Sequence, residues 1–511
     1  MLAKIKTCGV YGLHVSEIEA EVDISNGLPA INIVGLGDMA IRESKERVRA
    51  AIKNSGASFP MKRITINLAP ADTKKEGTHF DLPIALGILA ASEQIKMDMI
   101  FDFCVLGELS LDGKVNKVNG VLPMLLGMFN KGYRKIILPK ENVKEARLVE
   151  EMEIYGVSHL QEVIQWLNNE ETVVPVTGHH FENEKFTQYD HDIRYLKGQD
   201  NLKRALEIAA AGGHNLLMVG PPGAGKTMAA RSLSSIMPQM TFEEALEVTK
   251  IHSVAGILDS EKGLVNRRPF RSPHHTISVT ALTGGGRIPK PGEVSLCHYG
   301  VLFLDELPEF SKGALEVLRQ PLEDRVISIS RAHSSCTYPA DFMLVVAMNP
   351  CPCGYYGSEG QQSCTCGAHQ INRYLNKISG PLLDRIDLMI EVRAVSYGDL
   401  KDNDKSEESS KCVGKRVQIA RELQQHRYKQ EKVLFNAQLN TIGINKYCVL
   451  EKEAEELLKM AFDKMKLSVR SHNRVIKVSR TIADLDKSEI ISKNHLAEAL
   501  QYRNLNHFSR R

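Results

Sequence analysis

A glycine-rich string in the middle of the chain constrains the fold more than any other feature. It consists of Gly220, Pro221, Pro222, Gly223, Ala224, Gly225, Lys226 and Thr227. An apolar run (Asn215–Gly220) precedes it, and a residue pattern typical of a helix begins near Lys226. This G-x-x-x-x-G-K-T pattern predicts a strand, a phosphate-binding loop and a helix whose positive N-terminus faces the phosphates. Lys226 would reach the β- and γ-phosphates of a nucleoside triphosphate such as ATP, and Thr227 would ligate Mg²⁺.

Two later apolar runs end in polar residues that suit the same chemistry. Val301–Glu306 ends in Asp305 and Glu306, and Met343–Asn349 ends in an amide. Asp305 would hold Mg²⁺ through water, Glu306 would polarise the attacking water, and Asn349 would orient that water. Apolar runs separated by helical text predict an α/β fold with a parallel sheet.

The length of 511 residues predicts several domains. A polar stretch at 175–196 and another at 398–411 suit linkers, which leaves three domains at 1–174, 197–397 and 412–511. The net charge of +3 excludes a globally basic nucleic-acid binder but allows a local basic patch. Apolar runs are too short to span a bilayer, and the first residues lack a signal-peptide pattern. We therefore expect a cytoplasmic protein with reduced cysteines and no membrane partner.

Local periodicity predicts individual elements in the first and last domains. Ile64–Pro70 and Lys135–Pro139 read as buried strands, and Met39–Gly56 reads as an amphipathic helix with a glycine stop. Glu451–Met465 and Arg474–Leu485 carry apolar residues at helical spacing. The first domain therefore mixes strands with helices, and the last domain is helical.

Four of the ten cysteines fall within 16 positions, at Cys351, Cys353, Cys364 and Cys366. Four thiolates suit a structural, tetrahedral Zn²⁺ with no open position for catalysis. His369 is an alternative fourth ligand. Free thiols in a mobile loop and a redox-sensitive pair are the other readings.

Five strings together resemble one known family. They are LEIAAAGGHNLLMVGPPGAGKT (206–227), FRSPHHTIS (270–278), NPCPCG (349–354), SGPLLDRIDL (379–388) and TIADL (481–485). With them the chain resembles the YifB/ComM family of magnesium-chelatase-like AAA+ ATPases over essentially its whole length. The resemblance implies an AAA+ P-loop NTPase core, an N-terminal Lon-protease-like α+β domain related to ribosomal S5 domain 2, and a C-terminal helical lid domain.

The resemblance also implies a ring of identical subunits, a homo-hexamer by family expectation. In such rings an arginine from a neighbouring subunit stabilises the charge that develops on the γ-phosphate. Arg385, within LLDRIDL, matches that position. A second arginine comes from the helical domain, where Arg470 matches best and Arg474 is an alternative.

Two segments of the central domain suit contact with a DNA backbone. The stretch Leu264–Gly292 contains two histidines and no acid, and its basic residues are Arg267, Arg268, Arg271, Arg287 and Lys290. Asp324–Phe342 alternates like a hairpin, which would place Arg331 and His333 near its tip. Related ring helicases touch DNA with a hairpin at this place. The alternative is that both segments only shape the interface between subunits.

The first domain resembles the proteolytic domain of Lon at residues 74–86, 107–115 and 137–142. Lon-type chemistry needs a serine activated by a lysine. By that alignment the two positions are His79 and Leu122, so we expect no peptidase activity and a scaffolding or DNA-facing role. The Val34–Gly37 stretch, with two glycines, is a weak dinucleotide-binding signal.

These observations favour an ATP-driven motor on single-stranded or branched DNA, and the resemblance specifies branch migration during homologous recombination of incoming DNA. One alternative is a metal-insertion ATPase subunit like that of magnesium chelatase. The other is a regulatory or chaperone ATPase that acts on a protein partner.

Overall fold

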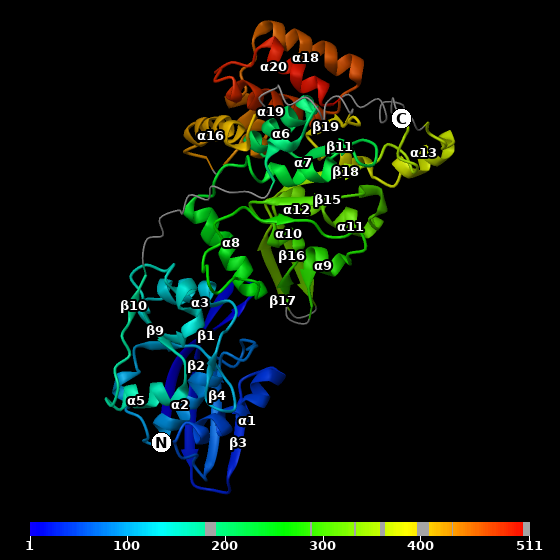
Figure 1. The fold of residues 1–511 in the computed structure, drawn as a ribbon. Coiled ribbons are helices and arrows are strands. Elements are labelled where there is room, and N and C mark those ends of the chain that lie inside the picture. The colour runs from blue at the N-terminus through cyan, green and yellow to red at the C-terminus, as the bar shows by residue number, and fades with distance from the viewer. Residues whose placement is uncertain are drawn as a thin grey trace.

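The computed structural model describes residues 1–178, 191–286, 289–331, 334–357, 363–395, 408–431 and 433–503. Three parts follow one another along an elongated molecule (Figure 1). The amino-terminal part (1–178) lies at one end, the central part (191–395) in the middle, and the carboxy-terminal part (408–503) at the other end. Among the described residues, no helix is both long and apolar enough to cross a lipid bilayer.

The amino-terminal part is built on an eight-stranded sheet of mixed direction. Across the sheet its strands are β10 (Val176–Thr177), β9 (Glu153–Val157), β8 (Lys135–Pro139), β5 (Phe103–Val105), β1 (Leu2–Tyr11), β2 (His14–Ser25), β4 (Arg63–Ala69) and β3 (Ala30–Val34). The helices α1 (Met39–Asn54), α2 (Asp81–Ala91), α3 (Val121–Asn130) and α5 (Leu160–Leu167) accompany it. Every residue of α2 is buried, which agrees with the continuous apolar sequence that follows Asp81. The two strands and the helix predicted here are confirmed as β4, β8 and α1.

The central part contains a five-stranded sheet in which every pairing is parallel. The strand order is β12 (Phe270–Arg271), β15 (Val301–Leu304), β18 (Met343–Met348), β11 (Leu216–Val219) and β19 (Leu388–Glu391). All residues of β11, β15 and β18 are buried, which explains their continuous apolar text. The predicted parallel sheet is therefore confirmed. Its carboxyl edge is where Gly220, Asp305 and Asn349 follow their strands.

Helices of the carboxy-terminal part share a hydrophobic core with the central part. They are α16 (Ser410–Arg427), α17 (Thr441–Tyr447), α18 (Lys452–Met465), α19 (Val469–Leu485) and α20 (Lys493–Gln501). Both α16 and α19 pack against α6 (Asp200–Gly212), which precedes the phosphate loop. The helical text predicted at 451–465 and 474–485 is confirmed in α18 and α19.

The two stretches predicted as linkers have structured ends. Val176 and Thr177 form β10 at the sheet edge. Ile193 is buried, and its backbone N–H donates to Ser410 Oγ at 2.8 Å. Residues 179–190 and 398–407 of these stretches lie outside the described residues.

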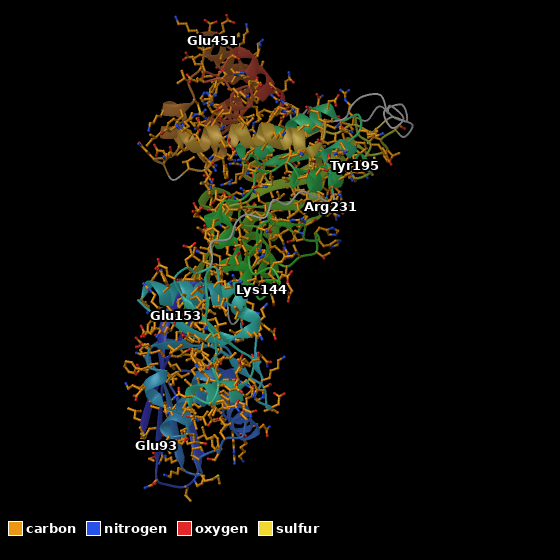
Figure 2. The ribbon with its side chains drawn as sticks, turned by 60° about the vertical axis from the view of Figure 1, so that its left-hand side comes forward. Glu93, Lys144, Glu153, Tyr195, Arg231 and Glu451 are labelled. Carbon is orange, nitrogen blue, oxygen red and sulfur yellow. The ribbon has the colours of Figure 1, made fainter. Side chains whose placement is uncertain are left out.

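The amino-terminal and central parts are packed together. Ala245 and Val248 of helix α8 (Phe242–Ala255) lie in a hydrophobic core that the helix shares with β1 and α3. Buried Ser253 of α8 donates to Glu145, and Gly120 N–H donates to Ser253 O at 3.1 Å. Lys144, labelled in Figure 2, pairs with Glu261 at 2.6 Å on the surface of this junction. The junction therefore combines apolar packing with buried hydrogen bonds.

Candidate nucleotide site and its surroundings

The phosphate loop (residues 220–227) follows β11 and leads into α7 (Lys226–Leu233). Gly223 and Gly225 have φ angles of +76° and +85°, which favour glycine. A β-carbon at Gly220 would lie 2.3 Å from the carbonyl oxygen of Val392, so the backbone can pass there only without a side chain. The loop therefore has the backbone path that the glycine-rich motif predicts.

Lys226 is held at the centre of the loop. Its Nζ donates to the carbonyl oxygens of Gly220 at 2.7 Å and Pro221 at 2.9 Å, and to Asn349 Oδ1 at 3.1 Å. Burial lowers the pKa of Lys226, and the charges of Asp305 and Glu306 oppose that shift. The ammonium is thus held by two carbonyl groups of the phosphate loop itself, with the Asn349 amide beside it.

Thr227 and Asp305 meet across the sheet edge. Thr227 Oγ1 donates to Asp305 Oδ2 at 2.9 Å, and Asp305 Oδ1 accepts from the Glu306 backbone N–H at 2.9 Å. A hydroxyl and a carboxylate oxygen in contact are a donor set that Mg²⁺ accepts, so the residues present fit that ion. Glu306 has a φ of +52°, a left-handed conformation that is strained for this residue type. Its side chain is 59% exposed and therefore lies outside the core.

His275 is a neighbour of the site that the sequence analysis did not assign. Its Nδ1 lies 3.5 Å from Glu306 Oε2, and its ring packs edge-on to Phe310. The only sequence signal for it was the FRSPHHTIS string, which indicated the family and no role for either histidine. The structure therefore adds His275 to the polar groups that surround Glu306.

The four clustered cysteines converge in the loop that joins β18 to α13 (Ala368–Leu375). Cys351 Sγ lies 3.3 Å from Cys353 Sγ and 3.7 Å from Cys364 Sγ, and the last two are 3.6 Å apart. All four sulfur atoms lie within 4.8 Å of one another. Tetrahedral Zn²⁺ with bonds of about 2.3 Å separates its sulfur ligands by about 3.8 Å, whereas a disulfide needs about 2.0 Å. The spacing fits a metal, and the fourth position is Cys366 rather than exposed His369.

The two arginines expected to act in a ring lie at the amino edge of the same sheet. Arg385 precedes β19, whose first residue pairs with the first residue of β11. Glu323, on α12 (Arg319–Asp324), forms an ion pair with buried Arg385 and lies 3.6 Å from Arg470 Nη2. Burial lowers the pKa of Arg385, and Glu323 opposes that shift. The structure brings these arginines together with each other, and it does not bring them to the phosphate loop of the same chain.

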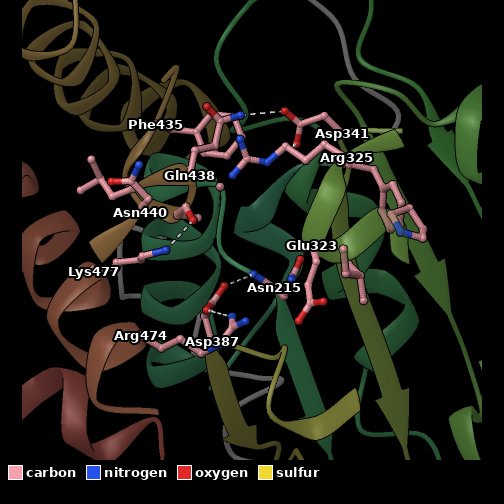
Figure 3. Close-up of a pocket in the computed structure, with 16 residues that line it drawn as sticks. Asn215, Glu323, Arg325, Asp341, Asp387, Phe435, Gln438, Asn440, Arg474 and Lys477 are labelled. Atoms are coloured by element: carbon pink, nitrogen blue, oxygen red, sulfur yellow. Dashed lines mark hydrogen bonds and ion pairs between the residues drawn. The ribbon is translucent and has the colours of Figure 1, made fainter. Parts of the chain in front are cut away.

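A polar cavity of about 300 Å³ is lined by Glu323 and by Arg474, the alternative to Arg470 (Figure 3). Asp387 forms an ion pair with Arg474 and accepts from Asn215 N–H at 3.0 Å, while Gln438 donates to Asp341 at 2.7 Å. Burial opposes the charge of Asp387, but Arg474 and His214 outweigh it and hold the pKa of this carboxyl well below its usual range. Arg474 is thus occupied by a buried carboxylate, whereas Arg470 is 63% exposed.

Two arginines of the acid-free stretch are paired with carboxylates from outside it. Arg268 pairs with Glu244 at 2.8 Å and also donates to backbone carbonyls. Arg271 forms two bonds of 2.6 Å with Glu293. Arg267 and Lys290 are exposed. Arg287 lies outside the described residues.

The segment predicted to form a hairpin does so. Strand β16 (Val326–Arg331) pairs antiparallel with β17 (Ser334–Pro339). The turn residues, His333 included, and the side chain of Arg331 lie outside the described residues. In its half next to the turn, where Cys336 pairs with Ile329, the hairpin meets the amino-terminal part, because a β-carbon at Gly12 would clash with Cys336 Sγ.

The amino-terminal part places no nucleophile at its two predicted dyad positions. His79 is buried and bonds through Nε2 to Cys8 O at 3.0 Å, and burial lowers its pKa to about 4. Leu122 is an apolar core residue at the start of α3. Val34–Gly37 begins at the last residue of edge strand β3 and leads towards α1, where Asp38 caps the helix.

Comparison with known proteins places these features in a family context. A family model for magnesium chelatase, subunit ChlI, matches residues 192–400. A model for subunit ChlI of Mg-chelatase matches residues 20–142, and one for the C-terminal region of subunit ChlI matches residues 407–503. The three models together match residues in all three parts of the chain.

Whole-length relatives are also found. Competence protein ComM of Haemophilus influenzae is 45% identical over 509 residues, covering 98% of this chain and 97% of the relative. The YifB protein of Escherichia coli is 44% identical over 507 residues, with the same two shares. A partial likeness links the chain to Lon protease 2 of Bacillus subtilis, which is 31% identical over 148 residues, or 27% of this chain and 26% of the protease.

Proposed function

The chain belongs to the YifB/ComM family of magnesium-chelatase-like AAA+ proteins, and we propose on that premise that it is an ATP-driven motor that remodels DNA. The observation that carries the ATPase part is the 2.9 Å contact between Thr227 and Asp305. It joins the phosphate loop to the acid that follows β15, and Lys226 and Asn349 complete the same cluster.

Each residue of the cluster has a role in hydrolysis. The phosphate loop cradles the triphosphate, and Lys226 neutralises its β- and γ-phosphate oxygens. Thr227 and Asp305 hold Mg²⁺, which supplies positive charge to the phosphate oxygens when bound. Glu306 accepts a proton from the attacking water, and Asn349 orients that water. Arg385 and Arg470 of a neighbouring copy stabilise the charge that develops on the γ-phosphate in a homo-hexameric ring.

DNA is the proposed substrate of the motor. The relative of this chain in Haemophilus influenzae is named as a competence protein. That name supports branch migration during recombination of incoming DNA as the proposed activity. The β16–β17 hairpin and the segment Leu264–Gly292 are the proposed contacts, through exposed Arg267 and Lys290 and through Arg287 and Arg331. Arg268 and Arg271 act on the DNA less directly, because Glu244 and Glu293 already neutralise them.

The proposed role of the amino-terminal part is that of a Lon-like scaffold without peptidase activity. The partial likeness to Lon protease 2 supports the relationship. A buried, neutral imidazole at His79 and an apolar side chain at Leu122 leave no serine–lysine pair at these positions. Its packing against α8 suits a part that moves with the motor as one body.

The cysteine cluster is the proposed site of one structural Zn²⁺. Four sulfur atoms within 4.8 Å of one another support this assignment. Four thiolates saturate a tetrahedral ion and leave no position for water or substrate, so the metal has no catalytic part.

Strand exchange on a labelled three-stranded DNA branch tests the function. Wild-type protein, Lys226→Ala and the exposed control Arg231→Ala are compared with ATP and Mg²⁺. We expect wild type and Arg231→Ala to resolve the branch and Lys226→Ala to leave it intact. DNA binding without nucleotide should weaken steeply as salt rises, because phosphate contacts release counterions.

Two other outcomes separate the parts of the proposal. ATP hydrolysis without branch resolution or DNA binding would refute the DNA motor and favour a protein substrate or metal insertion. Normal hydrolysis in Lys226→Ala would refute the nucleotide site itself.

A further inference from the structure

The loop that carries the four cysteines also forms part of the surroundings of the phosphate loop. This cysteine loop (residues 350–367) begins one residue after Asn349, and residues 358–362 of it lie outside the described residues. Asn349 accepts a hydrogen bond from Lys226 at 3.1 Å. Cys351, two residues later, is fully buried. The first thiol is therefore separated by one residue from a side chain that touches the central lysine of the nucleotide site.

A second contact brings the backbone of Gly354 in the cysteine loop against the ring of Pro222 in the phosphate loop. Gly354 has a φ of +90°, and a β-carbon there would lie 2.6 Å from Pro222 Cδ. Only glycine allows the cysteine loop to approach the phosphate loop so closely. Gly354 N–H also donates to Cys351 O at 3.0 Å, so this turn is closed on the buried thiol.

A third contact is a shared cavity of about 300 Å³. Gly220 and Pro221 of the phosphate loop line it together with Tyr356 and Gly357 of the cysteine loop. Val392 and Arg393, after β19, lie on its remaining side. The cysteine loop is thus one wall of a space that opens beside the phosphate loop.

The sulfur cluster ties the first described stretch of this loop to the second. Cys351 and Cys353 lie before the segment outside the described residues, and Cys364 and Cys366 lie after it. Cys366 N–H donates to Cys364 Sγ at 3.4 Å, a bond that orients a sulfur ligand. The described loop residues contribute few apolar side chains apart from the cysteines, so a metal ion would supply most of its order.

We propose that the metal ion held by Cys351, Cys353, Cys364 and Cys366 fixes the cysteine loop against the phosphate loop and thereby sets the affinity for nucleotide. The inference rests on the nucleotide site of the proposed function. Without the metal, the wall formed by Gly354 and Tyr356 samples other positions, and the binding-competent arrangement becomes a minor state. If it is occupied about one-tenth of the time, nucleotide affinity falls about tenfold.

The test measures metal content and nucleotide binding on the full chain, without DNA and without hydrolysis. Native mass spectrometry counts zinc, and a fluorescent ADP analogue reports affinity in the presence of Mg²⁺. We expect one zinc per chain in wild type, loss of zinc and about tenfold weaker ADP binding in Cys364→Ser, and neither change in Cys412→Ser, which alters an exposed cysteine outside the cluster. Cys366→His keeps a zinc ligand and should retain both properties.

A second arm guards against a variant that fails to fold. Wild type is stripped of metal with a chelator, dialysed, and supplied with Mg²⁺ alone or with Mg²⁺ and Zn²⁺. Recovery of ADP affinity with Zn²⁺ supports the proposal. Unchanged affinity in zinc-free protein overturns the coupling, and reduced protein that binds no zinc overturns the metal site. Wild type that binds zinc but no ADP overturns the nucleotide site as well, whereas failure of DNA remodelling alone leaves these measurements intact.

Discussion

At the carboxyl edge of the core sheet, Lys226 contacts Asn349 and Thr227 contacts Asp305, all within one chain. At the amino edge, Arg385 and Arg470 contact Glu323 instead of the phosphate loop. The four residues of β11 separate the two edges by about 13 Å. One edge therefore carries the proposed catalytic site, and the other carries two arginines that do not reach the phosphate loop of their own chain and that we propose act on a neighbouring copy.

The difference also appears in how each edge satisfies its polar atoms. Lys226 uses three acceptors of its own chain. Arg385 Nε is buried and has no hydrogen-bond partner within the part of the chain that the structure describes. Buried donors are usually paired, and exceptions often mark functional positions. This comparison predicts that the carboxyl edge binds nucleotide in a single chain, while the amino edge contributes only after assembly.

The largest expected effect tests the carboxyl edge. Glu306→Gln removes the acceptor for the proton of the attacking water, and we expect ATP hydrolysis to fall about 10³-fold. Nucleotide affinity should stay close to that of wild type, because Glu306 does not contact the phosphate loop in the described hydrogen bonds. Steady-state hydrolysis and equilibrium binding of ADP check the two halves. Glu309→Gln, whose carboxylate pairs with Lys377 on the surface, is the control. An equal decrease of ATP hydrolysis in both variants would contradict the proposed role of Glu306.

The next largest effect concerns the stability of the amino edge. Asp387→Asn leaves Arg474 without its buried anion, and we expect the free energy of unfolding to fall by about 3 kcal/mol. The pKa of Asp387 is lowered in the folded protein, so this carboxylate stabilises the fold above the unfolded pKa of about 4, and the contribution is lost as pH falls below it. Thermal unfolding of wild type and variant between pH 3 and 7 measures this. The exposed control Asp463→Asn should leave the free energy of unfolding almost unchanged. A similar decrease in both variants would show that the Asp387 ion pair does not stabilise the fold.

Much of the carboxyl edge could be predicted from the sequence, because its residues follow apolar strands whose carboxyl ends meet in a parallel sheet. Lys226, Asp305 and Asn349 therefore come together by topology alone. Partners that arrive from elsewhere could not be predicted. Glu293, one residue beyond the acid-free stretch, neutralises Arg271, and His275 reaches Glu306 by a side-chain contact that no spacing encodes.

The amino edge shows the same limit in another form. The family motif identified Arg385 and Arg470 but gave no signal for Glu323, which lies on a different helix and pairs with both. It also left Arg474 as an alternative to Arg470. The structure separates the two, since Arg474 is bound to buried Asp387 and Arg470 is largely exposed. Which cation is available depends on tertiary contacts, and the sequence pattern does not contain them.

The third effect sharpens the comparison between the edges. Arg385→Ala should lower ATP hydrolysis about 100-fold, because a donor to the developing phosphate charge is removed. ADP binding by the separate chain should not change, since Arg385 lies at the opposite edge from its own phosphate loop. Arg373→Ala, an exposed arginine on α13, is the matched control.

Mixing variants tests whether Arg385 acts on a neighbour. In equal mixtures of Arg385→Ala and Glu306→Gln, about a quarter of random interfaces combine an intact Glu306 with an intact Arg385. Hydrolysis should therefore reappear on mixing two nearly inactive proteins. No recovery, with subunit exchange verified by mass spectrometry, would show that both residues act within one chain.

The smallest effect concerns Glu323, which pairs with both arginines before assembly. If it competes with the phosphate of a neighbour's nucleotide, then Glu323→Gln frees the arginines and lowers the protein concentration needed for half-maximal hydrolysis. Partly exposed ion pairs contribute up to about 1 kcal/mol, so the shift should not exceed about fivefold. Glu316→Gln, on the preceding helix and paired only with Arg319 among the described ion pairs, should leave that concentration unchanged. A rise in the required concentration would mean instead that Glu323 holds Arg385 in the orientation that the neighbour needs, and the amino edge would then be preorganised rather than restrained.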